Sequence, residues 1–209
     1  MATFSDDLLR VENPLSTLGW ANVAIDGGIN KLRSNAGAFS TNTADYGSEY
    51  VSGVSFTADQ EVSAQVATIG NTGGAEICAL FARLANPGGS SVSGYELEVD
   101  QGGAMKVYRI QNWATQTQII TSSHALAAGN WVKLRVTGTN PVVITIFWSS
   151  DGVNWTQVAT FNDSAATRVQ TGSRVGLEVL KNAPRIKNFF ATDYPPAGPV
   201  RNDEFFAFI

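Results

Sequence analysis

The sequence predicts an all-β protein in which two antiparallel sheets form a sandwich. Strand-like apolar runs recur from residue 18 to residue 193, and Gly, Asn, Ser and Asp separate them at short intervals. No segment has the periodicity of a helix, so alternating βαβ units are not indicated. A hairpin signal, Asp151-Gly152, lies between the runs at 142–149 and 154–161. Because Asp-Gly favours a type I′ turn with positive φ at both residues, these runs should pair.

Each predicted strand is a short run that ends in turn-forming residues. In the run at 142–149 both alternating faces are largely apolar, so this strand should lie inside a layered sheet. Ala58 to Gln60 separate two runs, and the Pro-Gly-Gly segment within 85–94 predicts a long surface loop. The predicted strands lie at 18–24, 28–35, 48–57, 60–69, 75–84, 94–100, 104–111, 116–121, 130–137, 142–149, 154–161, 174–180 and 185–193.

Length and composition predict one domain with a short appendage. A chain of 209 residues fits a single large all-β domain, and 44% hydrophobic residues suffice for a core. We assign residues 1–193 to the sandwich and 194–209 to a Pro-rich, aromatic tail, because the stretch at 194–199 is typical of a stiff, extended linker.

Charge and cysteine usage exclude several classes of function. The net charge is −4, and no Lys/Arg cluster is interleaved with aromatics, so a nucleic acid is not an expected partner. The N-terminus carries Asp6 and Asp7 rather than a basic region before an apolar one, so no signal peptide is predicted, and no apolar run approaches the roughly 18 residues of a membrane span. Cys78, the single cysteine, lies in the apolar run AEICALFARLA and should be a buried, inert thiol.

Several segments, in order, resemble one fold family. They are FSDDLLRVENPLSTLGW near the start, SGYELEVD followed by MKVYRI, GNWVKLRVTG, the Ser-Ser-Asp-Gly hairpin with NWTQVATF, TGSRVGLEV, and KNFFATD near residue 193. This order resembles the concanavalin A-like lectin/glucanase jelly roll, including laminin G-like domains, over roughly residues 4–193. The opening strand also resembles modules in virion proteins of tailed phages.

The resemblance implies a sugar-binding or particle-surface role. We expect a non-enzymatic virion structural protein, either a capsid decoration or a tail-associated protein, that is assembled in the host cytoplasm. Its partners would be other virion proteins or further copies of itself, and its lectin-like domain could bind a glycan. The alternative is a stand-alone carbohydrate-binding module, and a glycoside hydrolase is a third reading.

The glycoside hydrolase hypothesis depends on one run of acidic residues. Glu96, Glu98 and Asp100 alternate along a predicted strand and share one face. This resembles the acidic strand of laminarinase-like hydrolases, in which two carboxylates act as nucleophile and general acid. Here Glu98 stands where that family prefers Asp, and Asp100 where it has Glu. We therefore assign no catalytic residue and expect ion pairs with cations on neighbouring strands, for which the candidates are Arg83, Arg109, Lys133 and Arg135.

A loop tryptophan is the main binding candidate. Trp113 lies in RIQNWATQTQ, whose polar residues are typical of an exposed loop, so its ring could stack on a sugar or instead fold back over the sheet. We expect Trp20, Trp131 and Trp148 to pack in the core and Trp155 beside the hairpin. The candidate glycan contacts are Trp113, Gln111, Asn112, Gln116, Glu96 and Glu98.

Metal chemistry has little support, and no cofactor is predicted. His124 is the only histidine, which excludes His-rich zinc sites. A Ser-His-Asp triad would have to use His124, which lies in the loop-like segment TSSHALAAG. Calcium stays open as a ligand because several aspartates lie near turns, where Asx turns are the alternative role. These are Asp26, Asp45, Asp151 and Asp163.

The C-terminal aromatic residues predict a subunit contact. Each large apolar side chain gains about 1.5–3 kcal/mol from full burial, so this cluster should dock either on its own sandwich or on a neighbouring subunit. The residues are Phe205, Phe206, Phe208 and Ile209.

Overall fold

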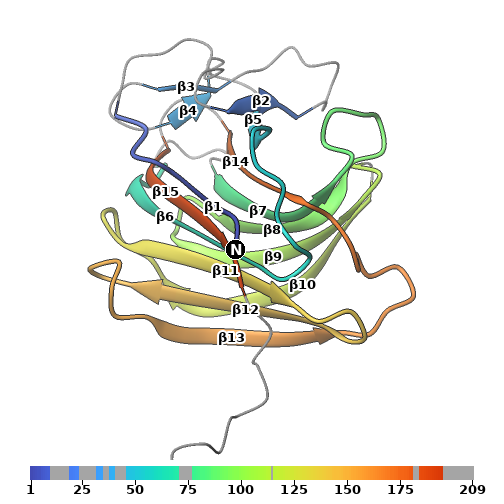
Figure 1. Cartoon of the computed structure of the whole chain (residues 1–209). Helices are drawn as coiled ribbons and strands as arrows, with labels where there is room; N and C mark the ends of the chain where they lie inside the picture. The colour runs from blue at the N-terminus through green and yellow to red at the C-terminus, as the bar shows by residue number, and fades with distance from the viewer. Residues whose placement is uncertain are drawn as a thin grey trace, which may run out of the picture.

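Two antiparallel sheets packed face to face form the protein in the computed structural model (Figure 1). The structure describes residues 1–9, 19–23, 47–70, 77–113, 115–180 and 184–194, together with the backbone of 32–34, 38–40 and Tyr46. Within these residues the regular elements are all strands, which confirms the predicted all-β sandwich. None of the described segments is a helix long and apolar enough to cross a bilayer.

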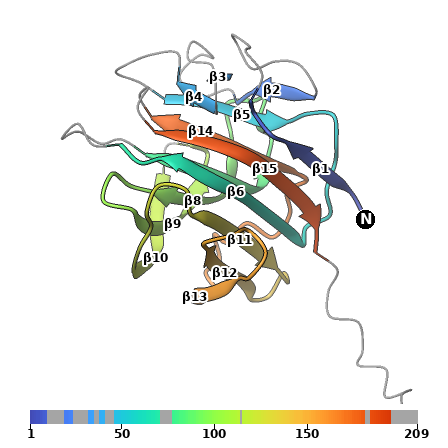
Figure 2. The ribbon, with the colours of Figure 1, turned by 90° about the vertical axis from the view of Figure 1, so that its left-hand side faces the viewer.

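The first sheet, sheet A, contains both ends of the described chain. Its order is β13-β12-β11-β6-β15-β4-β3, and β1 pairs with β15. Figure 2 shows β1 running beside β15. The strand bounds are β1 Thr3–Asp6, β3 Leu32–Ser34, β4 Ala38–Ser40, β6 Gln60–Thr68, β11 Trp131–Thr137, β12 Val142–Ser149, β13 Thr156–Asp163 and β15 Arg185–Asp193.

The second sheet, sheet B, has the order β10-β9-β8-β7-β14-β5-β2. Its strands are β2 Trp20–Asn22, β5 Tyr46–Val51, β7 Cys78–Ala85, β8 Ser93–Val99, β9 Ala104–Gln111, β10 Thr115–Ala125 and β14 Arg174–Leu180. The predicted run at 48–57 is wrong in its second half, because β5 ends at Val51 and the amides of Ser52 and Gly53 turn to the carbonyl of Gly19.

The core lies between the sheets and consists of the apolar side chains that point inward from each strand. Leu97 of sheet B and Leu134 and Ile144 of sheet A are fully buried in one continuous cluster. Cys78 is buried as predicted, and burial raises the pKa of its thiol to about 12. The thiol is therefore protonated and inert at neutral pH.

The hairpin at Asp151-Gly152 is confirmed, although its turn differs from the predicted one. β12 and β13 pair antiparallel, but only Gly152 in the connection has positive φ (76°). The carboxylate of Asp151 accepts hydrogen bonds from the backbone N–H groups of Val153 and Asn154, both at 2.8 Å. These bonds lower the pKa of Asp151, so its carboxylate acts as a turn former, as the Asx-turn alternative anticipated.

The predicted core tryptophans divide into two groups. Trp20 is buried, lies edge-on to Phe4, and donates its indole N–H to Asp6 at 2.7 Å. Trp148 is half-buried against the core and stacks on His124 with ring centroids 4.4 Å apart. Trp131 is different, because Val132 points into the core and Trp131 therefore lies on the outer face of sheet A. Its predicted core position is wrong.

Candidate functional site

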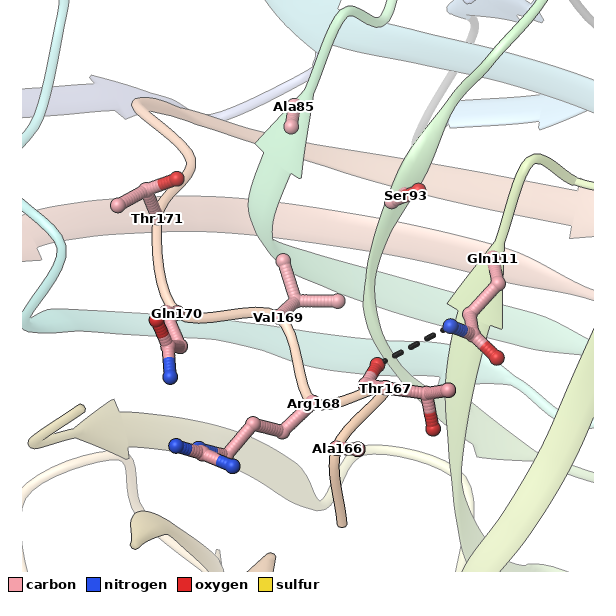
Figure 3. A pocket seen from close by; sticks show the side chains of 9 residues that line it. All are labelled: Ala85, Ser93, Gln111, Ala166, Thr167, Arg168, Val169, Gln170 and Thr171. Atoms are coloured by element: carbon pink, nitrogen blue, oxygen red, sulfur yellow. Dashed lines mark hydrogen bonds between the residues drawn. The ribbon is translucent and has the colours of Figure 1, made fainter. Parts of the chain in front are cut away.

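A pocket of about 460 Å³ opens at one end of the sandwich, where three strands of sheet B meet the loop between β13 and β14 (Figure 3). Ala85 ends β7, Ser93 begins β8 and Gln111 ends β9. The amide of Gln111 points across the opening and donates a hydrogen bond to the carbonyl oxygen of Thr167 at 3.1 Å. We call this opening the rim pocket; its lining residues are Ala85, Ser93, Gln111 and 166–171.

A buried polar network beneath the rim pocket holds its loop. Tyr95 of β8 donates its hydroxyl proton to Asp163 of β13 at 2.9 Å and accepts the backbone N–H of Val169 at 3.1 Å. Arg109 of β9 pairs with the same carboxylate at 2.8 Å. Burial, and then the hydrogen bond to Asp163, raises the pKa of Tyr95, so its hydroxyl stays a donor. This network joins the two sheets directly under the loop.

Arg83 fixes the other side of the loop. Its side chain is fully buried, and its guanidinium donates to the carbonyl oxygens of Val169 and Gly138 at 3.2 and 2.6 Å and to the carboxylate of Asp59 at 3.1 Å. Burial lowers the pKa of this guanidinium, while Asp59 opposes the shift. Gly172 packs so closely that a Cβ there would lie 2.1 Å from the carbonyl oxygen of Arg83. The pocket wall is thus preorganised.

The acidic strand does not form the ion pairs that we expected. Arg83 pairs with Asp59 and Arg109 with Asp163, while Lys133 and Arg135 both pair with Glu61. Of the acidic run, Asp100 pairs with Lys106 of the neighbouring strand at 3.0 Å. The expected partners are wrong because Arg109 faces the core, Lys133 and Arg135 lie on β11 of the other sheet, and Arg83 of the neighbouring strand β7 is turned to Asp59 and the carbonyl oxygens of Val169 and Gly138.

Glu96 is fully buried on the outer face of sheet B. No N–H or hydroxyl group donates to either of its carboxylate oxygens, and its side chain faces Glu178 of β14 within hydrogen-bonding reach, so the two acids can bond only when one of them is protonated. Burial, followed by repulsion from Glu178 and Glu98, raises the pKa of Glu96 well above its ordinary value. Burial also raises the pKa of Glu98, which is half-buried. Glu96 therefore does not lie on a solvated strand face, and it does not line the rim pocket.

Trp113 folds back against the sheet and is half-buried. Its ring lies edge-on to Phe81 at 5.9 Å, and its backbone N–H donates to the carbonyl oxygen of Val92 at 2.8 Å. Asn112 and Trp113 have consecutive positive φ values of 51° and 56° in the connection between β9 and β10. A bulky residue rarely adopts this conformation.

The structure brings only part of the predicted site together. Gln111 lines the rim pocket, and Asn112 adjoins it by donating its backbone N–H to the hydroxyl of Ser93 at 3.2 Å. Gln116 is exposed on β10, outside the lining. The predicted contact residues Phe205, Phe206, Phe208 and Ile209 lie outside the described residues.

Sequence reasoning missed the β13–β14 loop, which supplies most of the pocket wall. Its segment Ala166 to Thr171 reads ATRVQT, a polar stretch after a predicted strand. Loops between strands often carry binding residues, so this composition was an available signal. Nothing in the sequence shows that the loop meets Ser93 and Gln111.

The described residues do not bring the candidate calcium ligands together. They contain no group of three or more His, Cys, Asp or Glu side chains that could hold a metal ion. Asp151 forms its own turn and Asp163 belongs to the buried network, while Asp26 and Asp45 lie outside the described residues. Calcium binding therefore stays a prediction.

Comparison with known proteins shows the fold. No protein-family model matches the sequence, and a search of curated proteins finds no match. The Ca²⁺-bound VIP36 exoplasmic/lumenal domain superposes with a TM-score of 0.62 at 13% identity, covering 94% of this chain and 91% of that one. The potassium-bound carbohydrate recognition domain of Emp46p gives 0.60 at 10% identity, with 91% and 96% covered. The chain therefore has the concanavalin A-like jelly-roll fold that the sequence predicted.

A third similar structure comes from an enzyme. The xylan β-1,4-xylosidase of Bacillus halodurans C-125 superposes with a TM-score of 0.51 at 12% identity, over 90% of this chain but only 38% of that one. The fold thus occurs both in lectin-type domains and as part of a larger enzyme, so function has to be argued from the site.

Proposed function

We propose that this chain is a non-enzymatic, lectin-like display domain that binds a glycan in the rim pocket. The observation that carries the proposal is the pocket's lining of hydroxyl and amide groups on a rigid frame. Hydroxyls and amides both donate and accept hydrogen bonds, as sugar hydroxyls do. Ser93, Gln111 and Thr171 are three such groups, and Val169 adds an apolar contact.

The fold supports the same proposal. One structure of the similar VIP36 domain holds Ca²⁺ and Man3GlcNAc, and the Emp46p domain is a carbohydrate recognition domain. Loops at the ends of sheets, positioned by a packed scaffold, are frequent binding sites.

Binding is favoured over hydrolysis by the placement of the carboxylates. A glycosidase of the common type needs two carboxyl groups flanking the scissile bond. The rim pocket has no Asp or Glu among its lining residues, and Glu96 is buried elsewhere. We therefore propose capture of a glycan without its cleavage.

The test of the site is Gln111→Ala. A glycan array first identifies a ligand, and calorimetry then measures its affinity for wild type and variant. Losing a hydrogen bond of about 1–1.5 kcal/mol should weaken binding roughly 5- to 12-fold. Gln157→Ala on β13 is the matched control, because Gln157 is an exposed glutamine outside the pocket lining. Equal affinities of the three proteins for the array ligand would remove the rim pocket from the proposal.

The setting that we propose is the surface of a tailed-phage particle, on the capsid or the tail. Its support is the resemblance of the opening strand to modules in virion proteins of tailed phages, and the aromatic tail is the proposed anchor to other virion proteins or to further copies of the chain. Deleting residues 195–209 should abolish self-association or particle binding, measured by sedimentation. Unchanged sedimentation would contradict the anchor and favour a stand-alone carbohydrate-binding module.

A further inference from the structure

A second pocket lies on the outer face of sheet A, in a part of the molecule that the proposed function does not use. Its volume is about 430 Å³, close to that of the rim pocket. Three strands contribute to it, namely β1, β11 and β15. We call it the face pocket; its lining residues are Ser5, Asp6, Asp7, Trp131, Asn188, Phe189 and Phe190.

Two aromatic side chains form the sides of the face pocket. Trp131 pairs with Gln65 of β6 from one side, and Phe190 pairs with Ser63 of β6 from the other. Since neighbouring strands lie about 4.8 Å apart, the strands that carry the two rings are about 10 Å apart. Trp131 is half-buried and Phe190 is 41% exposed, so both rings present surface to solvent.

The ring of Trp131 is held in place from behind. Gly152 of the β12–β13 turn packs under it, and a Cβ at that position would lie 2.7 Å from the indole. The φ of Gly152 is 76°, which also favours glycine. The turn thus makes Trp131 a fixed platform.

The side-chain amide of Asn188 lines the face pocket together with the rings of Trp131 and Phe190. Asn188 occurs at a break in the register of β15 and has a φ of 52°, a conformation that costs an ordinary residue about 1–2 kcal/mol. Its side-chain N–H donates to Gln65 at 2.9 Å, and Gln65 donates in turn to the carbonyl oxygen of Gly129 at 2.8 Å. This chain of hydrogen bonds orients Asn188 and leaves its side-chain oxygen as an acceptor. Bulges frequently re-aim a side chain in this way.

We propose that the face pocket is a saccharide-binding site, separate from the rim pocket. Aromatic rings offer flat apolar surfaces to the C–H faces of a pyranose, and a few fixed polar groups then select its hydroxyls. The amide of Asn188, the hydroxyl of Ser5 and the carboxylate of Asp7 are such groups. Asp6 and Asp7 would repel the phosphates of a nucleic acid, so the ligand is an uncharged sugar chain.

The experiment follows the indole N–H signals of the full chain by ¹H–¹⁵N NMR. The chain has five tryptophans, and single Trp→Phe variants assign their signals. The probes are cellohexaose, xylohexaose, mannohexaose and chitohexaose. At least one probe should shift the Trp131 signal saturably, and Phe190→Ala should raise its dissociation constant at least fivefold. Asn188→Gly, which keeps the left-handed backbone but removes the amide, should weaken binding as well.

Two controls separate this site from other effects. Phe161→Ala removes another exposed phenylalanine, outside the pocket, and should leave the Trp131 response unchanged. Gln111→Ala, in the rim pocket, should also leave the Trp131 response unchanged. A failure of glycan binding in the rim pocket can therefore be distinguished from a failure of saccharide binding in the face pocket. The proposal is overturned if no probe shifts Trp131 at millimolar concentration, or if Phe190→Ala and Asn188→Gly respond like wild type.

Discussion

At the scale of single residues, burial decides what the carboxyl group of Glu96 can do. The group lies under the outer surface of sheet B against Glu178, and Ser48 donates its hydroxyl proton to Glu178. Ala79 of β7 pairs with Glu178 on one side and with Glu98 on the other, so a small side chain lies between the strands that carry the acids. A shared proton between Glu96 and Glu178 is the arrangement that this packing favours.

This burial predicts a pH-dependent stability. The pKa of Glu96 is raised in the folded protein, so between its ordinary value of 4.5 and the raised value the folded state holds a proton that the unfolded state has lost. The free energy of unfolding should therefore fall as pH rises through this window. Glu96→Gln keeps the shape and supplies a permanent N–H donor, so it should flatten the dependence and stabilise the protein at pH 8 by about 1–3 kcal/mol.

Urea denaturation at pH 5 and pH 8 measures the effect. Asp7→Asn is the control, because Asp7 is an exposed acid and its replacement should leave the slope of stability against pH nearly as in wild type. A Glu96→Gln protein that loses stability between pH 5 and pH 8 as steeply as wild type would show that Glu96 does not hold the proton.

At the scale of elements, the sequence predicted strands and hairpins better than it predicted sites. The hairpin of β12 and β13 could be predicted because apolar alternation and Asp-Gly are local signals. The type of its turn could not, since the ring of Trp131 from β11 packs on Gly152. The rim pocket could be predicted only in part, because it too depends on contacts between residues far apart in the sequence. Gln111 lies in a segment whose polar composition is a local signal. Residues 166–171 are brought beside it by the buried contacts of Tyr95 and Arg83.

The contact between Gly152 and the ring of Trp131 can be tested by comparing two glycines that both have positive φ. Gly152→Ala adds both backbone strain and a clash with Trp131, whereas at Gly129, where φ is 91°, an added Cβ meets nothing within 4 Å. Strain alone should cost about 1–2 kcal/mol at Gly129, and Gly152→Ala should cost at least about 1 kcal/mol more. Thermal denaturation compares the two variants. An equal loss in both would mean that the Trp131 contact contributes nothing.

At the scale of the whole molecule, the sandwich links the ends of the described chain to the rim pocket. The backbone N–H of Ala2 donates to the carboxylate of Asp193 at 2.6 Å, and that of Tyr194 donates to the carbonyl oxygen of Asp59 at 2.8 Å. Asp59 in turn pairs with Arg83, which holds the pocket loop through Val169. In the display domain that we propose, this connection would join the anchored end of the chain to the surface that binds.

The most direct test of the account is to map the backbone amides of the chain by NMR while adding the strongest ligand from a glycan array. We predict that shifts concentrate at Gln111 and residues 166–171, and that the signals of the glycan itself show no cleavage during the measurement. Shifts that avoid these residues, the absence of any glycan ligand, or the appearance of cleaved sugar would contradict the central claim that the rim pocket binds a glycan without hydrolysing it.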